Sequence, residues 1–341
     1  MNLSIIIPTL NSASVICKCL EAIKKSTYDD YEVIVVDGGS IDGTISIAKN
    51  HTENVIILDR DNGRGHARNI GIIKSKGQIL VFTDSDNIIK KDSLKIIAEY
   101  FLKHSDVAAV TGSVSKEHPN QDFFSQYKNL YMCYKFEMLP EAVYFLQGDI
   151  YAVRRKDIEI SDLDVTTDDT ERGQILNAKS KKIIFLKDLC VIHLKKYNFI
   201  KLLKNDFKIP YDWVKIFIKY RGLAQMIKNK GNYAHAPKGQ LISIILSLLI
   251  MVFVFLNLLV TINSYLLLIL FLIWFLLNFK FFLFLKKEKG FMFGFMKALP
   301  ITFLDNIVMI TGILFGFLNV IFYKGCKTNK TEQNTNIRFG P

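Results

Sequence analysis

Short apolar runs alternate with helical patterns along the first third of the chain. LSIII, EVIVV, NVIIL, QILVF and VAAVTG fall within residues 3–113, and segments such as residues 12–25 separate them. Such alternation predicts a mostly parallel sheet that helices cover on both faces. A second set follows: a helix at 122–138, strand VYFLQ, a helix at 168–179, and strands KIIFL and CVIHL. We therefore expect an α/β domain over residues 1–195.

The pattern then changes to long apolar segments. Residues 196–238 place spaced apolar residues among lysines and end in the linker GNYAHAPKG. This favours basic amphipathic helices at a membrane surface, with a solvated helical hairpin as the alternative. Residues 241–260 contain no charge, and 20 residues at about 1.5 Å each span a hydrocarbon core of roughly 30 Å. We expect an all-α transmembrane module over 239–323, with further spans at about 264–285 and 301–323.

Details of the last spans give the expected topology. TINS forms a short turn, KKEKG marks the positive, cytosolic side, and an interfacial helix is expected at about 290–300. The third span contains Asp305, as an interfacial residue or an intramembrane acid, with the interfacial interpretation favoured; Gly312 and Gly316 have helix-contact spacing. A multi-pass protein of the cell membrane with a cytosolic catalytic domain follows. Three spans place the polar tail, 324–341, outside, although that tail is itself positively charged.

Charge is distributed unevenly along the chain. The net charge of +12 arises from the C-terminal part, where residues 195–341 contain 20 Lys and Arg against 5 Asp and Glu. Because this basic charge accompanies apolar helices, it suits anionic membrane lipids better than nucleic acid. The five cysteines lack metal-type spacing and are expected to be reduced. The opening MNLSIIIPTL lacks a basic start and predicts a core strand, not a signal peptide.

Candidate chemistry follows the predicted strands. Pro8, Asp37 and Asp84 come directly after apolar runs, so a parallel sheet brings them to the edge where α/β proteins bind ligands. Asp84 and Asp86 are two residues apart, and an extended backbone points both carboxylates the same way. Two hard oxygen ligands suit Mg²⁺ or Mn²⁺, which bridges the diphosphate of a nucleotide.

Four motifs carry a family resemblance. IIIPTLNS, VVDGGSIDGT, GRGHARNIGI and FTDSDN occur in this order, and together they resemble the family 2 glycosyltransferases of the glycosyltransferase A-type fold. The resemblance covers residues 1–194 and implies that Asp37 binds the nucleobase and that Asp86 is the more direct metal ligand. DGGS replaces the usual DDGS, which removes one carboxylate. The implied nucleotide site comprises Pro8, Thr9, Asn11, Asp37, Ser40, Arg68 and Asp84.

The second half of the resemblance concerns the sugar and the acceptor. FLQGDIYAVRR resembles the loop beside the donor sugar, which implies that Gly148 and Asp149 face the acceptor. TTDDTERGQIL implies that Asp169 is the catalytic base, with Asp168 capping the helix. His193 matches a late histidine on the metal. Structural alternatives remain open: a helix cap for Asp169, a structural role for His193, and a surface salt bridge for Arg68.

The implied reaction is inverting, metal-dependent transfer of a single sugar. The donor is a UDP- or GDP-type nucleotide sugar, and the acceptor is a lipid-linked glycan hydroxyl at the cytosolic leaflet. A polyprenyl-phosphate sugar synthase is the first alternative, although NIIKK follows the D-x-D motif where such synthases usually have QHPPE. A sugar nucleotidyltransferase and an inactive membrane scaffold are the others. The Q-x-x-R-W motif of processive members is not found in the sequence.

Overall fold

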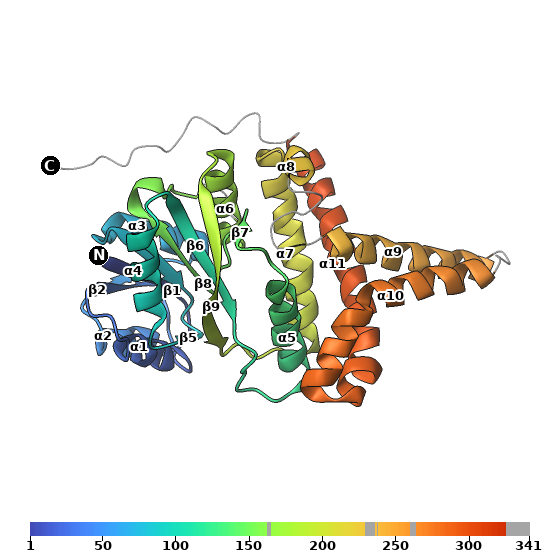
Figure 1. Cartoon of the computed structure of the whole chain (residues 1–341), viewed down its shortest axis with the longest axis horizontal. Helices are drawn as coiled ribbons and strands as arrows, with labels where there is room; N and C mark the ends of the chain where they lie inside the picture. Colours follow the sequence, from blue (N-terminus) through green and yellow to red (C-terminus); the bar gives the residue numbers. More distant parts are fainter. Residues whose placement is uncertain (162–164, 229–235, 237, 260–263, 325–341) are drawn as a thin grey trace.

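The computed structural model describes residues 1–161, 165–228, 236, 238–259 and 264–324. A sheet flanked by helices forms the N-terminal part, α7 and α11 run beside it, and the α9–α10 hairpin projects away from them (Figure 1). Most of the expected linker at 231–239, the TINS turn and the tail from residue 325 lie outside the described residues.

Nine strands form one mixed sheet in the order β3-β2-β1-β4-β8-β6-β9-β5, with β7 paired to β9. β1 lies parallel to β2 and β4, β2 to β3, and β6 to β9; the β8, β5 and β7 pairings are antiparallel. The strands are β1 (Leu3–Thr9), β2 (Tyr31–Asp37), β3 (Val55–Ile57), β4 (Ile79–Thr83), β5 (Asn87–Ile89), β6 (Val107–Val114), β7 (Ala142–Val143), β8 (Ile150–Arg154) and β9 (Lys182–His193).

Helices cover both faces because successive residues of the central strands are all buried. Ile5 and Ile7 pack into one apolar core and Ile6 into another. α1 and α4 contribute to the first core, and α3 and α6 to the second. These helices are α1 (Ile16–Lys24), α2 (Thr44–Lys49), α3 (Arg64–Lys74), α4 (Ser93–Lys103), α5 (Phe123–Glu137) and α6 (Asp168–Ala178), with a 3₁₀ turn, η1, at Arg155–Asp157. The expected α/β fold of the glycosyltransferase A type is confirmed.

The second set of predicted strands is partly wrong. In the expected strand VYFLQ, only Val143 belongs to a strand, and the true strand begins after it, at Ile150. KIIFL and CVIHL belong to one strand, β9, which parallel β6 and antiparallel β5 both contact. Apolar runs indicate burial, but backbone pairing decides which buried residues form a strand.

The C-terminal part is helical. α7 (Phe199–Lys219) and α8 (Gly222–Lys228) precede α9 (Lys238–Leu259), α10 (Ser264–Lys289), a π-helical turn, η2 (Met292–Lys297), and α11 (Ala298–Lys324). By length and composition, three helical segments could cross a membrane: Lys238–Asn257, Tyr265–Lys289 and Met292–Phe322. Outward-facing apolar side chains such as Leu268, Leu276 and Phe255 give α9 and α10 the surface of lipid-exposed helices.

α11 packs lengthwise on α7 (Figure 1). A Cβ on Gly312 would lie 2.4 Å from the carbonyl oxygen of Phe207, and one on Gly316 would lie 2.8 Å from that of Tyr211. The glycines therefore allow the two helix backbones to approach closely. Their spacing serves a contact with α7, whose five lysines and two aspartates make it the most charged helix of this region.

Asp305 is buried within the protein, and its side chain is only 2% exposed. It lies close enough to Asp206 on α7 and Lys128 on α5 to interact with their charges. Asp305 is buried because α11 packs on α7, which turns this part of α11 toward the protein interior. Its position relative to a membrane stays a prediction.

We predict that Gly312→Ala destabilises the protein, because the added methyl group overlaps the α7 backbone. Overpacking of this kind costs about 1–3 kcal/mol. Gly239→Ala is the matched control, since nothing lies within 4 Å of a Cβ at that helical position. Thermal unfolding in detergent compares the two variants. Equal melting temperatures would contradict the close α7–α11 contact.

Candidate active site

The ends of three parallel strands meet as expected. Thr9 at the end of β1 lies opposite Asp37 at the end of β2, and β4 runs parallel on the other side of β1 and ends next to Asp84. Carboxyl ends of neighbouring parallel strands form the ligand-binding edge of α/β sheets. Asp37 and Asp84 therefore lie along one edge.

Hydrogen bonds connect Asp37, at the end of β2, to the loop that follows this strand. Its Oδ1 accepts from the backbone N–H groups of Gly39 (2.9 Å) and Ser40 (2.6 Å), and its Oδ2 accepts from the Ser40 hydroxyl (2.7 Å). The Asn11 N–H in turn donates to Ser40 Oγ at 2.7 Å, and Asn11 adopts a left-handed φ of 48°. Asp37 is fully buried and orders this loop; its contact with a nucleobase stays a prediction.

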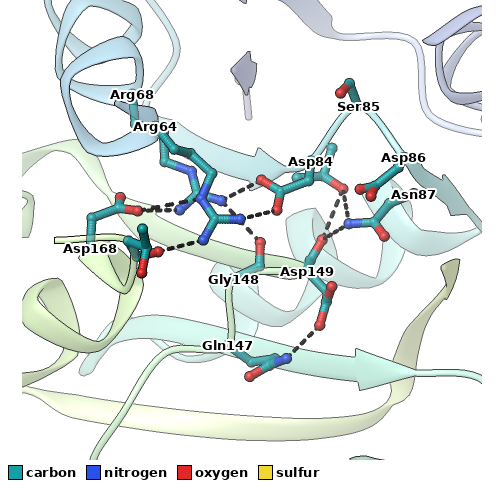
Figure 2. Close-up of polar contacts among 12 residues, drawn as sticks. Arg64, Arg68, Asp84, Ser85, Asp86, Asn87, Gln147, Gly148, Asp149 and Asp168 are labelled. Atoms are coloured by element: carbon teal, nitrogen blue, oxygen red, sulfur yellow. Dashed lines mark hydrogen bonds and ion pairs between the residues drawn. The ribbon is translucent and has the colours of Figure 1, made fainter. Parts of the chain in front are cut away.

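Two arginines of α3 bind the carboxylate of Asp84 (Figure 2). Arg64 Nη1 donates to Asp84 Oδ2 and Arg68 Nη2 to Asp84 Oδ1, both at 2.6 Å. Arg68 Nη1 also donates to Asp168 Oδ1 at 2.8 Å, and Nη2 reaches the Gly148 carbonyl at 3.1 Å. Arg68 thus joins three segments that are far apart in the sequence: the end of β4, the loop before β8 and the start of α6.

These contacts change two expectations. Arg68 is fully buried, so a surface salt bridge is the wrong description. Asp168 does not cap α6, because its carboxylate pairs with Arg68 and, at 3.4 Å, with Arg172. These charges hold the pKa of Asp168 below its usual value against the opposing effect of burial. The position of Asp168 at the start of α6 suggested a cap, but its ion pair with Arg68 involves a segment far away in the sequence, which a local pattern does not indicate.

Arg64 is a further residue of this site that the sequence motifs did not identify. Unlike Arg68, its side chain is 40% exposed and borders the cavity described below. Arg64 and Arg68 are four residues apart and share one face of α3, so the i,i+4 spacing within GRGHAR could have identified the pair. Arg64 therefore leaves a guanidinium partly exposed at the cavity, whereas Arg68 holds the surrounding segments in place.

Asp86, Asp149 and His193 form the second group. β5 pairs with β9 so that Asn87 lies opposite His193, which brings His193 Nε2 within 3.4 Å of Asp86 Oδ2 and 3.9 Å of Asp149 Oδ1. Burial disfavours the charged form of Asp86, but the neighbouring His193 and Lys195 lower its pKa to about 2. Gly148 and Asp149 thus lie beside the metal-ligand candidates.

The donor chemistry of this group fits a divalent cation in part. Asp86 and His193 offer a carboxylate oxygen and an imidazole nitrogen side by side, a combination suited to Mn²⁺. Asp84 differs, because arginines bind both of its oxygens. Within the described ranges, no three His, Cys, Asp or Glu side chains are already arranged to hold a metal ion.

Asp169 lies at the start of α6, opposite the Gly148 loop. A Cβ on Gly148 would lie 3.0 Å from Asp169 Oδ2, so a larger residue would crowd this carboxylate. Burial, and then the negative charge of Asp168, raise the pKa of Asp169 to about 6. A carboxylate with this pKa accepts a proton more readily than an ordinary one near neutral pH.

A cavity of about 720 Å³ connects these groups. Its catalytic end is lined by Arg64, Asp84, Asp86, Gly148, Asp149, Asp169 and His193. The predicted nucleotide residues Pro8, Thr9, Asn11, Asp37 and Ser40 do not border it, and neither do Arg68 and Asp168. The cavity continues past α5 and α7 to Gln240 on α9 and Met309 on α11.

The mixed sheet has the glycosyltransferase A-type fold, with acidic residues at its strand ends beside the cavity. Residues 4–160 match the sequence model of Glycosyl transferase family 2. This match agrees with the family resemblance of the strand-end motifs.

Relatives agree with this classification. A PGL/p-HBAD biosynthesis glycosyltransferase of Mycobacterium bovis is 32% identical over 151 residues, which are 42% of this chain and 59% of the relative. Glycosyltransferase AglE of Haloferax volcanii is 46% identical over 90 residues, 24% of this chain and 30% of AglE. The chain thus spans less than two thirds of the length of these relatives.

Solved structures share the fold. A Pyrobaculum calidifontis mannosyltransferase in complex with GDP-Man and Mn²⁺ gives a TM-score of 0.51 at 21% identity, over 64% of this chain and 63% of that one. S. aureus TarS 1–349 in complex with UDP-GlcNAc gives 0.50 at 18% identity, over 95% and 92%.

We predict that Arg68→Met lowers the free energy of unfolding by about 3–5 kcal/mol, because it leaves Asp84 and Asp168 with fewer cationic partners in a buried site. Arg64→Met is the control on the same helix. Its partly exposed ion pair should contribute about 1 kcal/mol or less. Denaturant unfolding of both variants checks this contrast, and similar losses for the two would contradict a special role for the buried arginine.

Proposed function

We propose that the protein transfers a single sugar from a UDP- or GDP-type nucleotide sugar to a lipid-linked acceptor, with inversion at the anomeric carbon. The supporting observation is that Asp86, His193 and Asp169 border one cavity that reaches the apolar helices. The cavity thereby offers a metal-ligand pair, a carboxylate with raised pKa and a route for a lipid-linked molecule.

The proposed reaction is a single displacement. An acceptor hydroxyl attacks the anomeric carbon, its proton passes to Asp169, and the bond to the nucleoside diphosphate breaks. Asp86 and His193 would hold Mg²⁺ or Mn²⁺, which when bound neutralises charge on the departing diphosphate. Arg64 lies beside Asp84 and offers a further cation to the same phosphates.

A phosphate oxygen is the second candidate nucleophile. Lysines border the cavity both beside Asp86, at Lys195, and beyond the catalytic end, at Lys128, Lys135, Lys204, Lys208 and Lys215. A polyprenyl-phosphate sugar synthase would need cations of this kind. The two acceptors differ in their need for a base, because a hydroxyl holds its proton at neutral pH whereas a phosphate is already ionised.

We propose that α9 and α10 cross the membrane as a hairpin and that α11 lies along its cytosolic surface. α11 packs along the length of α7. The charged residues of α7 would each cost about 2.5–3.5 kcal/mol in the centre of a bilayer, so the two helices are expected to lie outside it. Exposed Phe315, Leu318 and Phe322 suit an interfacial helix. This arrangement differs from the three spans expected from sequence and keeps the basic tail on the cytosolic side, as the positive-inside tendency favours.

Asp86→Ala should abolish transfer and metal-dependent donor binding while the fold survives, because it removes one of two candidate metal ligands. Calorimetric titration with UDP- and GDP-sugars in the presence of Mn²⁺ measures binding, and circular dichroism controls for folding. Full activity of the variant would refute the assigned metal site. A wild-type protein that binds no nucleotide sugar would favour an inactive scaffold.

Asp169→Asn should lower turnover by on the order of 10²- to 10⁴-fold with little change in donor affinity, if the acceptor is a hydroxyl. Asp168→Asn serves as a comparison, since that carboxylate pairs with arginines instead of facing the Gly148 loop. Near-normal turnover of Asp169→Asn with the native acceptor would favour a phosphate nucleophile or another base.

The pH dependence gives an independent check on Asp169. Its pKa of about 6 means that the carboxylate form is lost as the pH falls, so turnover should rise between pH 5 and pH 7. At pH 5 about one tenth of a group with this pKa is ionised, which predicts roughly tenfold slower turnover than at the plateau. Residual turnover of Asp169→Asn should lack this step; the same step in that variant would assign it to a different group.

Cysteine labelling decides the topology. Cys326 should react only with reagents that reach the cytosolic side, as the partly exposed Cys17 of the catalytic domain does. Inverted and right-side-out vesicles treated with an impermeant maleimide measure this, with Cys17→Ser and Cys326→Ser variants to assign the signals. Labelling of Cys326 from outside would instead support three spans.

A further inference from the structure

We propose that Lys135 binds the phosphate group of a lipid-linked acceptor within the cavity. This inference rests on the proposed transfer to a lipid-linked molecule. It adds a recognition group on α5, outside the strand-end motifs.

The two ends of the cavity differ in charge. Asp84, Asp86, Asp149 and Asp169 border the catalytic end, whereas the wall formed by α5 and α7 contributes lysines with Asp206 as its lining carboxylate. Gln240 on α9 and Met309 on α11 border this basic wall as well. The basic part of the cavity therefore adjoins the helices that would contact lipid, while the acidic part adjoins the donor site.

Lys128 and Lys135 are the buried lysines of this wall, and they differ in their ion pairs. Lys128 forms a hydrogen-bonded ion pair with Asp206, and Lys208 lies 3.4 Å from Asp212. Lys135 is only 9% exposed, and across the described ranges it forms no direct ion pair, although the charges of Asp206 and Asp305 act on it at longer range. Its Nζ lies 5.2 Å from the centre of the Tyr131 ring. Burial, and then the positive charge of Lys128, lower the pKa of Lys135 to about 7 against the opposing effect of Asp206 and Asp305.

A phosphate ester would supply an anion in direct contact with Lys135. Its oxygens accept charge-assisted hydrogen bonds from an ammonium group, which restores the charged form of the lysine. The diphosphate of the donor is better matched to Arg64 and the metal ligands at the opposite end. An anion that reaches Lys135 from the side of α9 and α11 is therefore expected to be attached to a lipid.

The alternative is a structural role, in which Lys135 packs on Tyr131 and balances the charges of Asp206 and Asp305. The two roles predict opposite effects on stability. Removal of a buried charge without a direct ion pair by Lys135→Met should leave the melting temperature unchanged or raise it, because a methionine fills similar volume without desolvation cost. Loss of a stabilising cation–π contact would lower the melting temperature.

The binding experiment uses the full-length protein in detergent, with farnesyl diphosphate as the probe and farnesol, inorganic pyrophosphate and UDP with Mn²⁺ as comparisons. Wild type should bind farnesyl diphosphate more tightly than farnesol or pyrophosphate. Lys135→Met should weaken that binding by about tenfold or more, Lys135→Arg should retain part of it, and UDP binding should not change. Lys103→Met, at an exposed position of α4, is the matched control and should behave as wild type.

Three outcomes would overturn the proposal. Unchanged farnesyl diphosphate binding by Lys135→Met removes the assigned group, and an equal loss of UDP binding assigns the lysine to the donor. Pyrophosphate that binds as tightly as farnesyl diphosphate points to a free anion. Asp86→Ala separates this result from the reaction itself, because it should lose UDP binding and keep farnesyl diphosphate binding. If no nucleotide binds to the wild type, the sugar transfer fails while the lysine-dependent lipid-phosphate binding can still be read.

Discussion

The buried guanidinium of Arg68 is the constraint on which the candidate site depends. It contacts Asp84 after β4, Gly148 before β8 and Asp168 at the start of α6. Because an unpaired charge in this position would be costly, the three segments are held at fixed distances from one another. That arrangement places Asp169 next to Gly148 and leaves Arg64 free of the core at the border of the cavity. Two arginines on one helix face thus differ in position: Arg68 is buried among three segments and Arg64 borders the cavity.

The adjacent carboxylates of Asp168 and Asp169 show how two neighbouring acids in a buried site acquire different pKa values. Asp168 is surrounded by guanidinium groups, which favour its charged form, whereas Asp169 experiences burial and the charge of Asp168, which disfavour it. Opposite pKa shifts on adjacent residues suit one to hold the structure and the other to exchange a proton. A change at Asp168 would therefore alter Asp169 as well, so the two positions are coupled.

The cavity extends from the strand-end residues to the apolar helices. Packing of α11 on α7 through Gly312 and Gly316 fixes the position of Met309, and α9 contributes Gln240. The charge of the wall changes along this path, from carboxylates at the strand ends to lysines on α5 and α7. An amphiphilic acceptor matches such a gradient, because its lipid, phosphate and sugar parts require different surroundings.

The sequence by itself determined the α/β class, the order of the strand-end motifs and the presence of long apolar helices. These features depend on local periodicity and on side chains close together in the chain. Only the tertiary structure decided that Asp168 pairs with Arg68, that Asp305 is buried and that Lys135 lies in the cavity without a direct ion pair among the described residues. Each depends on contacts between segments far apart in the sequence. The sequence alone gives no distance between such segments. Local patterns therefore could not distinguish a helix cap from an ion pair, or a surface lysine from a buried one.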